Sequence, residues 1–475
     1  MPNTYNPVTP TIIGELENIV GKRNVMHDDP EQLERYSHDE VADPHYASMP
    51  DVIVTPLSAE EISQIMKLAN REKIPVTPRG AGSGLSCGAV PVYGGIVLSL
   101  ERMNNVLEID PANLMITVEA GIVTNQINNV LEAYGLFYAG YPMSLETCFI
   151  GGNVAENAGG GKAIKYGVTD RYVHGLEVVL PTGEIVQLGG KRVKDVTGYD
   201  LIHLMVGSEG TLGIFTKVTL KLLPLPKAKV DLLVLFKTVQ EAIDLVPVIM
   251  TETGIIPTAI EFMDKLSAQT SCQYLNEHFA YEEAGAMLLI EVDGNSADQV
   301  ELQSEAIGEV CLQRGAIEVY VADNHTTQER VWKVRRNIAE AFKVYSPVQS
   351  LEDIVVPFAH IPQLIKDIDL LSQKYHILIP SYGHAGDGNL HSTPIKPPAM
   401  TMAAWYAMLP NILTDLYVSV AKLEGTISGE HGIGSKRKNF MKLVMQPELI
   451  EVMKRIKATF DPNQILNPGK IFPDN

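Results

Sequence analysis

The sequence predicts an α+β protein with two main domains, and three observations lead to this fold class. The chain has 475 residues, which is too long for a single hydrophobic core. Short apolar segments of strand composition alternate with segments in which apolar residues recur at helical spacing. A proline-rich stretch, LPLPK at 223–227, interrupts this alternation and indicates a domain boundary.

We therefore expect four consecutive parts along the chain. They are an N-terminal lead-in at 1–46, a first domain at 47–226, a second domain at 227–420 and a C-terminal segment at 421–475. Residues 10–36 have a charged, helical pattern, which predicts helical structure in a lead-in on the surface.

A β-α-β unit is expected near the start of the first domain. Its helix at 58–73 has apolar residues at helical spacing, and Ser58, with Glu61 three residues later, has the pattern of an N-cap. Strands are predicted on either side of the helix, and further strands follow. The predicted elements of this domain are strands at 51–56, 74–80, 94–100, 114–121, 175–189 and 213–226, and a second helix at 124–135 that ends at Gly135.

The second domain is also expected to alternate strands with helices. Strands are predicted at 230–236, 284–294, 317–323 and 350–357, and helices at 238–254, 299–315 and 361–375. A β-hairpin is predicted to follow them. The sequence shows no internal repeat and no low-complexity tract.

Composition excludes several classes of function. The net charge of −19 argues against a nucleic-acid partner, which would need clustered Lys and Arg. The four cysteines lie far apart and form no CxxC, so no disulfide framework and no iron–sulfur or cysteine-type zinc site is expected. The N-terminal sequence has no signal-peptide pattern, and no apolar run is long enough to span a membrane. We therefore expect a cytoplasmic protein.

Three glycine-rich loops are the main motifs of the first domain. They are RGAGSG at 79–84, IGGNVAENAGGGK at 150–162 and GSEGTLGI at 207–214. The first lacks the third glycine of a dinucleotide fingerprint, because Leu85 stands there, and Ala163 after the lysine excludes a Walker A loop in the second. One such loop is as compatible with a tight turn as with a phosphate cradle. Three of them in one domain indicate an extended, polar cofactor.

A second motif, YGHAGDGNLH at 382–391, predicts a β-hairpin with two histidines. With Asp387-Gly388 as a two-residue turn, His384 would face His391 across the two strands. Imidazoles so opposed could chelate one metal ion. The alternative is that both are ordinary polar residues on a solvated hairpin, and the hairpin by itself leaves both open.

The motifs together resemble a known family. PRGAGSG, YGVTDRYVHGLEVVLPTGEI and TGYDLIHLMVGSEGTLGI are similar to the FAD-linked oxidase family, with its vanillyl-alcohol-oxidase-type (PCMH-type) FAD domain. HAGDGNLH, SGEHGIGSKR and FDPNQILNPGKIF resemble the C-terminal domain of the D-2-hydroxyacid branch, which includes D-lactate dehydrogenases, the glycolate oxidase flavin subunit and D-2-hydroxyglutarate dehydrogenase. The resemblance implies a two-subdomain FAD-binding domain at 47–226, an α+β substrate (cap) domain at 227–420, and a tail at 421–475 that completes the active site and returns to the flavin.

The resemblance also implies which residues bind FAD. These are Arg79, Gly80, Ala81, Gly82, Ser83, Gly84, Leu85, Pro142, Ser144, Thr147, Gly151, Gly152, Asn153, Asn157, Tyr166, Gly167, Glu209, Gly210, Thr211, Gly213, Ile214 and, from the tail, Asn467. Many relatives tether FAD covalently through a histidine in the first loop. Because Ser83 occupies that position, we expect FAD to be bound non-covalently.

For the active site, the resemblance implies a divalent ion (Zn, Fe or Mn) bound by His384, His391 and Glu430. Three protein ligands leave open positions for substrate. His431 is implied as the general base. In an extended segment its side chain would point away from that of Glu430, so that one faces the metal and the other the substrate.

Arg335 matches the arginine of the family that grips the substrate carboxylate, whereas Arg336 is expected to be a solvated helix residue. The hydroxyglutarate enzymes carry a lysine at the position of Leu351. Its absence favours a short monocarboxylate such as lactate.

The implied activity is the oxidation of D-lactate to pyruvate by hydride transfer from C2 to flavin N5. Glycolate oxidase and D-2-hydroxyglutarate dehydrogenase activities are alternatives within the branch, and an ether-lipid synthase reaction is an alternative within the fold. From other classes, a metal-dependent hydrolase with a nucleotide-binding domain and a non-catalytic electron carrier stay open. Since the chain has no second redox motif, electrons are expected to pass to an electron-transferring flavoprotein or, less favoured, an iron–sulfur subunit.

Overall fold

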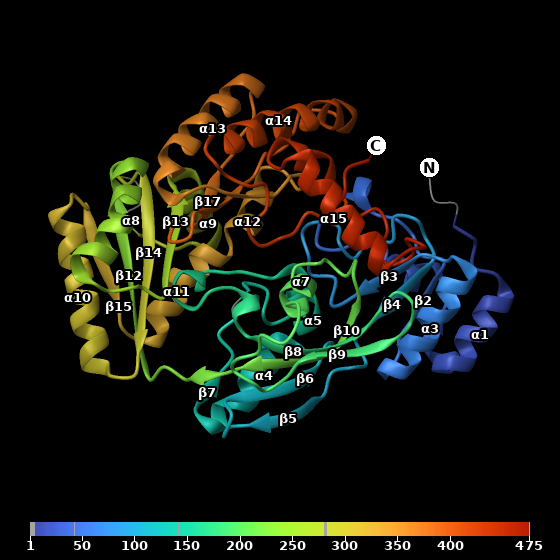
Figure 1. Ribbon diagram of the computed structural model, residues 1–475. Coiled ribbons are helices and arrows are strands. Elements are labelled where there is room, and N and C mark those ends of the chain that lie inside the picture. Colours follow the sequence, from blue (N-terminus) through green and yellow to red (C-terminus); the bar gives the residue numbers. More distant parts are fainter. Residues whose placement is uncertain (1–4, 42, 141, 280–282, 475) are drawn as a thin grey trace. The chain divides into compact units, whose positions relative to one another are not determined.

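The structure is a computed structural model that describes residues 5–41, 43–140, 142–279 and 283–474. Its chain divides into two compact units, each built from segments that are distant in the sequence (Figure 1). The first unit comprises Met1–Ala158, Val168–Pro224 and Glu430–Asn475, and the second comprises Gly159–Gly167 and Leu225–Gly429. Residues 430–475 of the C-terminal tail therefore belong to the same unit as most of the N-terminal half of the chain.

The first sheet of the first unit has four strands. Its order is β1 (Val25–Met26), β2 (Val52–Val54), β4 (Ile96–Ser99) and β3 (Val76–Arg79), with β2, β4 and β3 parallel. Helix α3 (Ala59–Glu72) connects β2 to β3, which confirms the predicted β-α-β unit. Its N-terminus is capped by Ser58, whose Oγ accepts the N–H of Glu61 at 3.2 Å.

The helical structure expected at 10–36 is present at the two ends of this range and not in its middle. Helix α1 (Pro10–Val20) ends at Gly21, which has a φ of +83° and reverses the chain. The following residues form a 3₁₀ turn and then β1, which pairs with β2, before the short helix α2 (Pro30–Glu34) begins. The charged pattern is helical at both ends, but pairing with a distant strand determines its middle.

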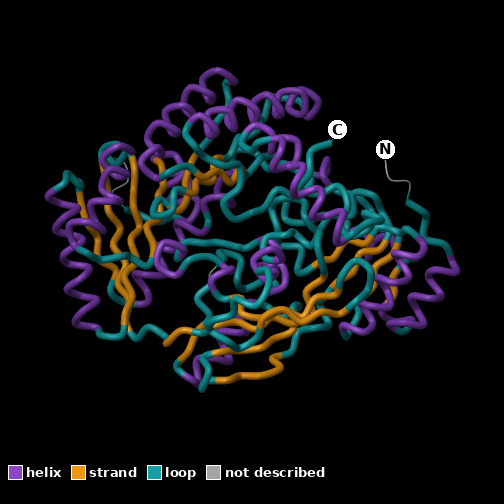
Figure 2. Tube along the Cα trace, in the orientation of Figure 1, coloured by secondary structure: helices purple, strands orange, loops and turns teal. Residues whose placement is uncertain are grey.

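An antiparallel five-stranded sheet forms the other part of the first unit. Its order is β5 (Val106–Asp110), β6 (Met115–Glu119), β10 (Ile214–Lys221), β8 (Val173–Val179) and β9 (Ile185–Gly189). A small sheet pairs β7 (Leu136–Phe137) with β11 (Leu223–Pro224). Further helices of this unit are α4 (Thr124–Leu131), α5 (Ile150–Glu156), α7 (Leu201–Met205) and α15 (Pro447–Phe460), with 3₁₀ turns at Lys22–Asn24, Pro44–Tyr46, Glu132–Tyr134, Thr169–Arg171 and Lys438–Leu443. Loops and turns occupy much of the chain between these elements (Figure 2). They include most of the glycine-rich segments at 79–84 and 207–214, whereas residues 150–156 of the segment at 150–162 form helix α5.

The second unit is built on an antiparallel seven-stranded sheet. Its order is β15 (Glu318–Ala322), β12 (Ala228–Phe236), β14 (Ala286–Gly294), β13 (Ala259–Asp264), β17 (Ser381–His384), β18 (Asn389–Ser392) and β16 (Glu352–Val355). Strands β12 and β14 run side by side in this sheet (Figure 1). Almost every residue of β14 is buried, so helices cover both faces of the sheet.

Two groups of helices provide this cover. One group contains α8 (Val239–Thr253), α10 (Ala297–Gln313), α13 (Ile361–Tyr375) and α14 (Met402–Lys422), and the other contains α9 (Lys265–Leu275), α11 (His325–Arg336) and α12 (Ile338–Ala341). The short helix α6 (Ala163–Tyr166) and 3₁₀ turns at Phe342–Val344 and Phe358–His360 complete the unit. In the described ranges, none of the helices combines the length and the apolarity that crossing a bilayer requires.

Candidate active site

The histidine hairpin forms, but with a different register from the one predicted. His384 pairs with Asn389, and His391 pairs with Tyr382. The direct opposition of His384 and His391 was therefore wrong. The loop comprises the four residues 385–388 instead of the two-residue turn expected.

The longer loop has a local cause. The carbonyl of His384 accepts the N–H of Gly388 at 3.1 Å, and the carboxylate of Asp387 accepts the N–H of Asn389 at 3.1 Å. Gly388 has a φ of +86°, and a Cβ at this position would lie 2.0 Å from the carbonyl oxygen of Val356. The side chain of Asp387 thus closes a wider loop, in which only glycine fits at 388.

The register differs from the predicted one by two residues, so the face on which each side chain lies is preserved. His384 and His391 are diagonal neighbours on one face, and their ring centroids are 5.4 Å apart. Both imidazoles are nearly fully buried. The expectation that the hairpin brings two imidazoles together is confirmed, although they are not cross-strand partners.

A buried carboxylate fixes the orientation of His384. Glu261 on β13 lies opposite His384, and its Oε1 is 2.6 Å from Nδ1 of the imidazole. The other oxygen of Glu261 is 2.7 Å from Nη2 of Arg335, whose guanidinium lies 5.0 Å from the ring centre of Tyr382. Burial would raise the pKa of Glu261, but His384 and Arg335 hold it below its usual value. The carboxylate selects the His384 tautomer with the lone pair on Nε2, as in metal-bound histidines.

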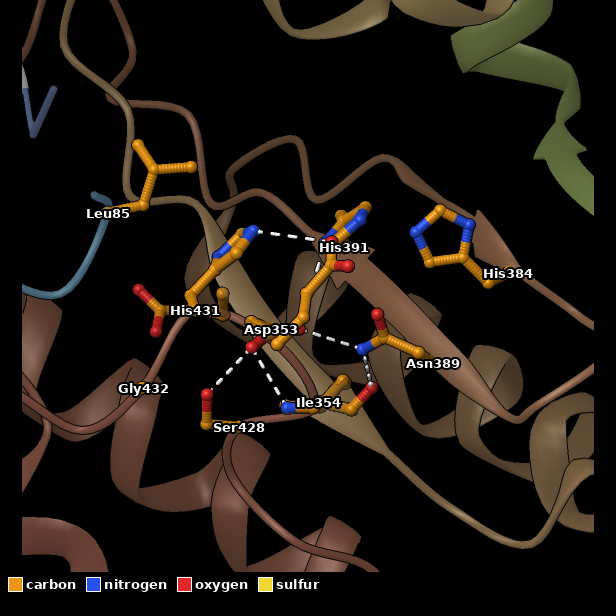
Figure 3. A network of polar contacts seen from close by, with 12 residues as sticks. Leu85, Asp353, Ile354, His384, Asn389, His391, Ser428, His431 and Gly432 are labelled. Carbon is orange, nitrogen blue, oxygen red and sulfur yellow. Dashed lines mark hydrogen bonds and ion pairs between the residues drawn. The ribbon is translucent and has the colours of Figure 1, made fainter. Parts of the chain in front are cut away.

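A second buried carboxylate lies beside His391. Asp353 on β16 pairs with His391, and Oδ1 of Asp353 accepts the side-chain N–H of Asn389 at 2.8 Å (Figure 3). Its Oδ2 accepts the hydroxyl of Ser428 at 2.7 Å and the N–H of Gly429 at 2.9 Å. Nδ1 of His391 is 4.0 Å from Oδ1 of Asp353. Asp353 therefore connects the hairpin to the residues that immediately precede Glu430.

The predicted ligand Glu430 and the predicted base His431 follow Gly429 in the chain. Oε1 of Glu430 is 3.6 Å from Nε2 of His431. The expectation that these two side chains point in opposite directions was wrong, because the chain bends at 429–431 and is not extended there.

The first glycine loop has the features of an anion site. The residues from Ala81 to Leu85 are half-buried, and within the described part of the chain their backbone N–H groups donate to no protein acceptor. A Cβ added to Gly80 would lie 3.7 Å from the backbone of Gly152, and one added to Gly152 would meet nothing within 4 Å. Consecutive donors beside an open backbone suit the pyrophosphate of FAD, so the residues fit this cofactor.

The side chain of Arg79 packs against this loop. Its Nη1 donates to the carbonyl of His38 at 2.8 Å, and a Cβ on Gly82, whose φ is +76°, would lie 2.0 Å from its Nη2. Burial lowers the pKa of the Arg79 guanidinium, although the nearby Asp39 opposes this effect. The guanidinium is thus hydrogen-bonded to the protein backbone.

The other predicted FAD residues belong to the first unit, except for two. Pro142, Ser144 and Thr147 form turns before α5, which contains Gly151, Gly152 and Asn153 and ends at Asn157, where φ is +52°. Gly210, Thr211 and Gly213 lie in the loop before β10, which begins at Ile214. Tyr166 and Gly167 belong to the second unit, where the hydroxyl of Tyr166 donates to Asp293 at 2.9 Å.

The tail is anchored to the third glycine loop by Asn467. Its side-chain N–H group donates to the carbonyl of Glu209 at 2.7 Å and to that of Gly88 at 3.2 Å. Lys457 strengthens the attachment, because its ammonium donates to the carbonyl of Thr211 at 2.6 Å. Asn467 therefore lies beside the third glycine-rich loop, which was expected, like Asn467 itself, to bind the cofactor.

Sequence reasoning assigned no role to Glu261 or Asp353. Each is a fully buried acidic residue in a strand that is otherwise largely apolar, as in AIEFMD and EDIVVP. Charged residues are almost never fully buried unless paired. An acid inside an apolar strand was therefore the available signal.

Comparison with known proteins is consistent with this geometry. Residues 50–189 match the model of an FAD binding domain, and residues 225–471 match that of the FAD linked oxidases, C-terminal domain. Glycolate oxidase subunit GlcD of Bacillus subtilis (strain 168) is 40% identical over 437 residues, 92% of each chain. D-lactate dehydrogenase of Anaerostipes hadrus is 38% identical over 472 residues, 98% of each chain.

Solved structures agree in fold. p-Cresol methylhydroxylase with substrate bound superimposes with a TM-score of 0.79 at 18% identity, over 97% of this chain and 96% of that one. Alkyldihydroxyacetonephosphate synthase superimposes with a TM-score of 0.77 at 21% identity, over 98% of this chain and 86% of that one. These likenesses confirm the predicted PCMH-type fold. The chain therefore belongs to the FAD-linked oxidase family and is an FAD-linked oxidoreductase.

Proposed function

We propose that the protein is an FAD-dependent D-2-hydroxyacid dehydrogenase that oxidises D-lactate to pyruvate. One observation carries this proposal: two buried imidazoles, His384 and His391, lie 5.4 Å apart on one sheet face, each beside a buried carboxylate. Such a cluster suits a divalent cation that binds the hydroxyl and carboxylate of a 2-hydroxy acid. The names of relatives at 38–40% identity, glycolate oxidase and D-lactate dehydrogenase, support the same substrate class.

The residues have distinct roles in this proposal. His384, His391 and Glu430 hold the ion (Zn, Fe or Mn), and His431 removes the proton of the substrate hydroxyl. Arg335 orients the substrate carboxylate with N–H groups of its guanidinium fork, which Glu261 holds in place. When bound, FAD supplies the acceptor for the hydride of C2, and the metal supplies the positive charge that lowers the pKa of the hydroxyl.

FAD is proposed to bind non-covalently along the three glycine loops and Asn467. The proposal includes the domain roles expected from the sequence: residues 47–226 bind the cofactor, residues 227–420 bind the substrate, and the tail at 421–475 completes both sites. It also includes a cytoplasmic location, which cell fractionation would test.

The choice of D-lactate over larger acids depends on Leu351. An apolar side chain there offers no cation to a second carboxylate. D-2-hydroxyglutarate is therefore the less favoured substrate, although a relative at 32% identity, from Stutzerimonas stutzeri, is named D-2-hydroxyglutarate dehydrogenase. Glycolate stays an alternative, because it differs from lactate by one methyl group.

Anaerobic bleaching of the flavin tests the proposal. The yellow holoprotein is mixed with D-lactate, L-lactate, glycolate or D-2-hydroxyglutarate, and the absorbance of oxidised flavin is followed. We expect D-lactate to bleach the flavin fastest and L-lactate to leave it oxidised. If none of the four acids bleaches the flavin, the proposed activity is wrong.

A further inference from the structure

The turn that follows His431 is held by one side chain from the third glycine loop. Oε1 of Glu209 accepts the N–H of Ile433 at 2.8 Å, and its Oε2 accepts the N–H of Gly434 at 2.6 Å. Both carboxylate oxygens are thus used on consecutive amides of residues 432–434, which we call the 432–434 turn. Hydrogen bonds to an ionised acceptor are the stronger kind.

Close packing leaves this turn little freedom. Gly432 has a φ of +82°, and a Cβ there would lie 2.0 Å from Oε2 of Glu156. Gly434 has a φ of +55°, and a Cβ there would lie 1.9 Å from the carbonyl oxygen of Ser86. The fully buried Arg437 donates to the carbonyl of Gly432 at 3.2 Å. The turn is therefore enclosed by residues of the first unit, and Glu209 is its anionic anchor.

The backbone of Glu209 is fixed as firmly as its side chain. Its φ is +51°, its N–H donates to the carbonyl of Ala155 at 2.8 Å, and its carbonyl accepts the side-chain N–H of Asn467 at 2.7 Å. Such a strained conformation persists only where the surroundings determine it. Burial raises the pKa of the Glu209 carboxyl, while the N–H groups of Ile433 and Gly434 oppose that rise.

We propose that Glu209 is a positioning residue, whose carboxylate fixes the 432–434 turn and thereby the imidazole of His431. The loop GSEGTLGI then has two roles. Its backbone follows the cofactor, and its one acidic side chain holds the segment that carries the proposed base. This inference rests on the proposed function, since it assigns Glu209 to the base of that reaction.

The test compares Glu209→Gln with Glu177→Gln in the FAD-loaded protein. A glutamine offers one acceptor and one donor, so it keeps at most one of the two hydrogen bonds. Glu177 is a matched control. It is as buried as Glu209, at 7% exposure, and its oxygens accept from Thr216 at 2.8 Å and Lys217 at 3.0 Å, outside the turn.

Three quantities are measured: hydrogen exchange at the amides of Ile433 and Gly434, the dissociation constant of FAD, and the rate and KM of flavin reduction by D-lactate. For Glu209→Gln we expect exchange to accelerate about tenfold or more. We expect the limiting reduction rate to fall about 10²-fold, as a misplaced catalytic group does. KM and FAD affinity should stay close to the wild-type values. Glu177→Gln should leave all of them unchanged.

Other outcomes overturn the proposal. Weakened FAD binding with unchanged exchange would make Glu209 a cofactor ligand, and results equal to those of Glu177→Gln would leave it a structural residue. If no 2-hydroxy acid reduces the flavin of the wild-type protein, the proposed function is wrong, and so is the role of Glu209 in positioning His431. Hydrogen exchange at the amides of Ile433 and Gly434 would still show whether Glu209 holds the 432–434 turn. Should Glu209→Gln not fold, Glu209→Asp keeps the charge but shortens the reach, and the same readouts apply.

Discussion

Glu261 shows at the scale of one residue how a buried acid can decide the role of a histidine. It is fully buried, yet its pKa lies below the usual value because its two oxygens face the imidazole of His384 and the guanidinium of Arg335. Removing one member of a buried ionic group leaves another member without its counter-charge. The geometry of His384 therefore depends on a residue that would not itself touch the metal.

This dependence predicts the effect of Glu261→Gln. The variant should bind the divalent ion about 10–100-fold more weakly, as is typical when the partner of a metal-bound histidine is lost. FAD content should not change. Metal titration of chelator-treated holoprotein, followed by elemental analysis, measures the affinity.

The matched control is Glu291→Gln. Glu291 is equally buried, lies on the adjacent strand β14 and pairs with Lys162 at 2.9 Å. The Glu291→Gln variant should bind the metal ion with the same affinity as the wild-type protein. Equal affinities for Glu261→Gln and the wild type would mean that His384 needs no orienting carboxylate, or is not a ligand.

Asp231 is expected to make the stability of the protein, rather than its catalysis, depend on pH. Burial and the nearby Glu291 raise its pKa to about 7, while the indole N–H of Trp332 donates to its Oδ1 at 3.0 Å. An acid whose pKa is raised on folding binds more protons in the folded state, so its contribution lowers stability as the pH rises from about 4 to 7.

Asp231→Asn should remove this loss of stability at higher pH, because asparagine does not ionise, and its side-chain oxygen can still accept the indole N–H of Trp332. We expect the variant to gain about 2 kcal/mol of unfolding free energy at pH 8 and to gain nothing, or to lose some stability, at pH 4. Urea unfolding at both pH values, followed by tryptophan fluorescence, measures the difference. A gain that is the same at both pH values would contradict the assignment.

At the scale of elements, two long strands of the second unit and several helices could be predicted because local pattern determines them. The apolar runs that became β12 and β14 are long and bounded by turn residues, and α3 begins at a recognisable cap. The hairpin register could not be predicted in this way. The dipeptide Asp387-Gly388 suggested a two-residue turn, but hydrogen bonds of His384 and Asp387 close a wider loop, which packs against Val356, a residue distant in the sequence.

Gly388→Ala tests this account of the hairpin. Alanine is disfavoured at the positive φ of this position, and its Cβ would lie 2.0 Å from the carbonyl oxygen of Val356, so the loop must move. We expect a loss of stability of about 3 kcal/mol and a loss of metal binding. Urea unfolding and metal titration measure the two effects.

Gly254→Ala is the control within the same unit. Gly254 also has a positive φ, +68°, but a Cβ there meets nothing within 4 Å. This change should cost only the conformational penalty, about 1 kcal/mol, and should leave metal binding unchanged. If both variants lose the same stability, the contact with Val356 does not determine the loop.

At the scale of the whole molecule, the family motifs allowed the PCMH-type fold and FAD to be predicted, whereas the partners of the site residues could not be. Glu261 and His384 are 123 positions apart and meet through the pairing of β13 with β17. Likewise, Glu209 and Gly434 are 225 positions apart. Motifs identify residues with chemical roles, but the contacts that orient them arise from long-range packing, which local patterns do not encode.

Non-covalent FAD is a prediction that concerns the holoprotein as a whole. Ser83 occupies the position of the tethering histidine, and a hydroxyl in that place does not form the corresponding bond. Acid precipitation should therefore release all flavin into the supernatant. Flavin that remains in the pellet of thoroughly washed protein would contradict the prediction.

The last prediction concerns where the electrons go after the flavin is reduced. All four cysteines, Cys87, Cys148, Cys272 and Cys311, are buried. The four are far apart in the sequence and form no CxxC motif of the kind that iron–sulfur clusters use. The sequence also carries no haem motif and no dinucleotide fingerprint. We therefore expect electrons to leave through a separate protein, with an electron-transferring flavoprotein favoured over an iron–sulfur subunit.

Stopped-flow reoxidation distinguishes these routes. The holoprotein is reduced anaerobically by D-lactate and mixed with NAD⁺ alone, with an electron-transferring flavoprotein, or with both. We expect slow reoxidation by NAD⁺ alone and fast reoxidation once the flavoprotein is present, because electron transfer to NAD⁺ would need a nucleotide site that the sequence does not offer. Fast reoxidation by NAD⁺ alone would contradict the prediction. Fast reoxidation by an iron–sulfur protein but not by the flavoprotein would replace the favoured partner with the other one.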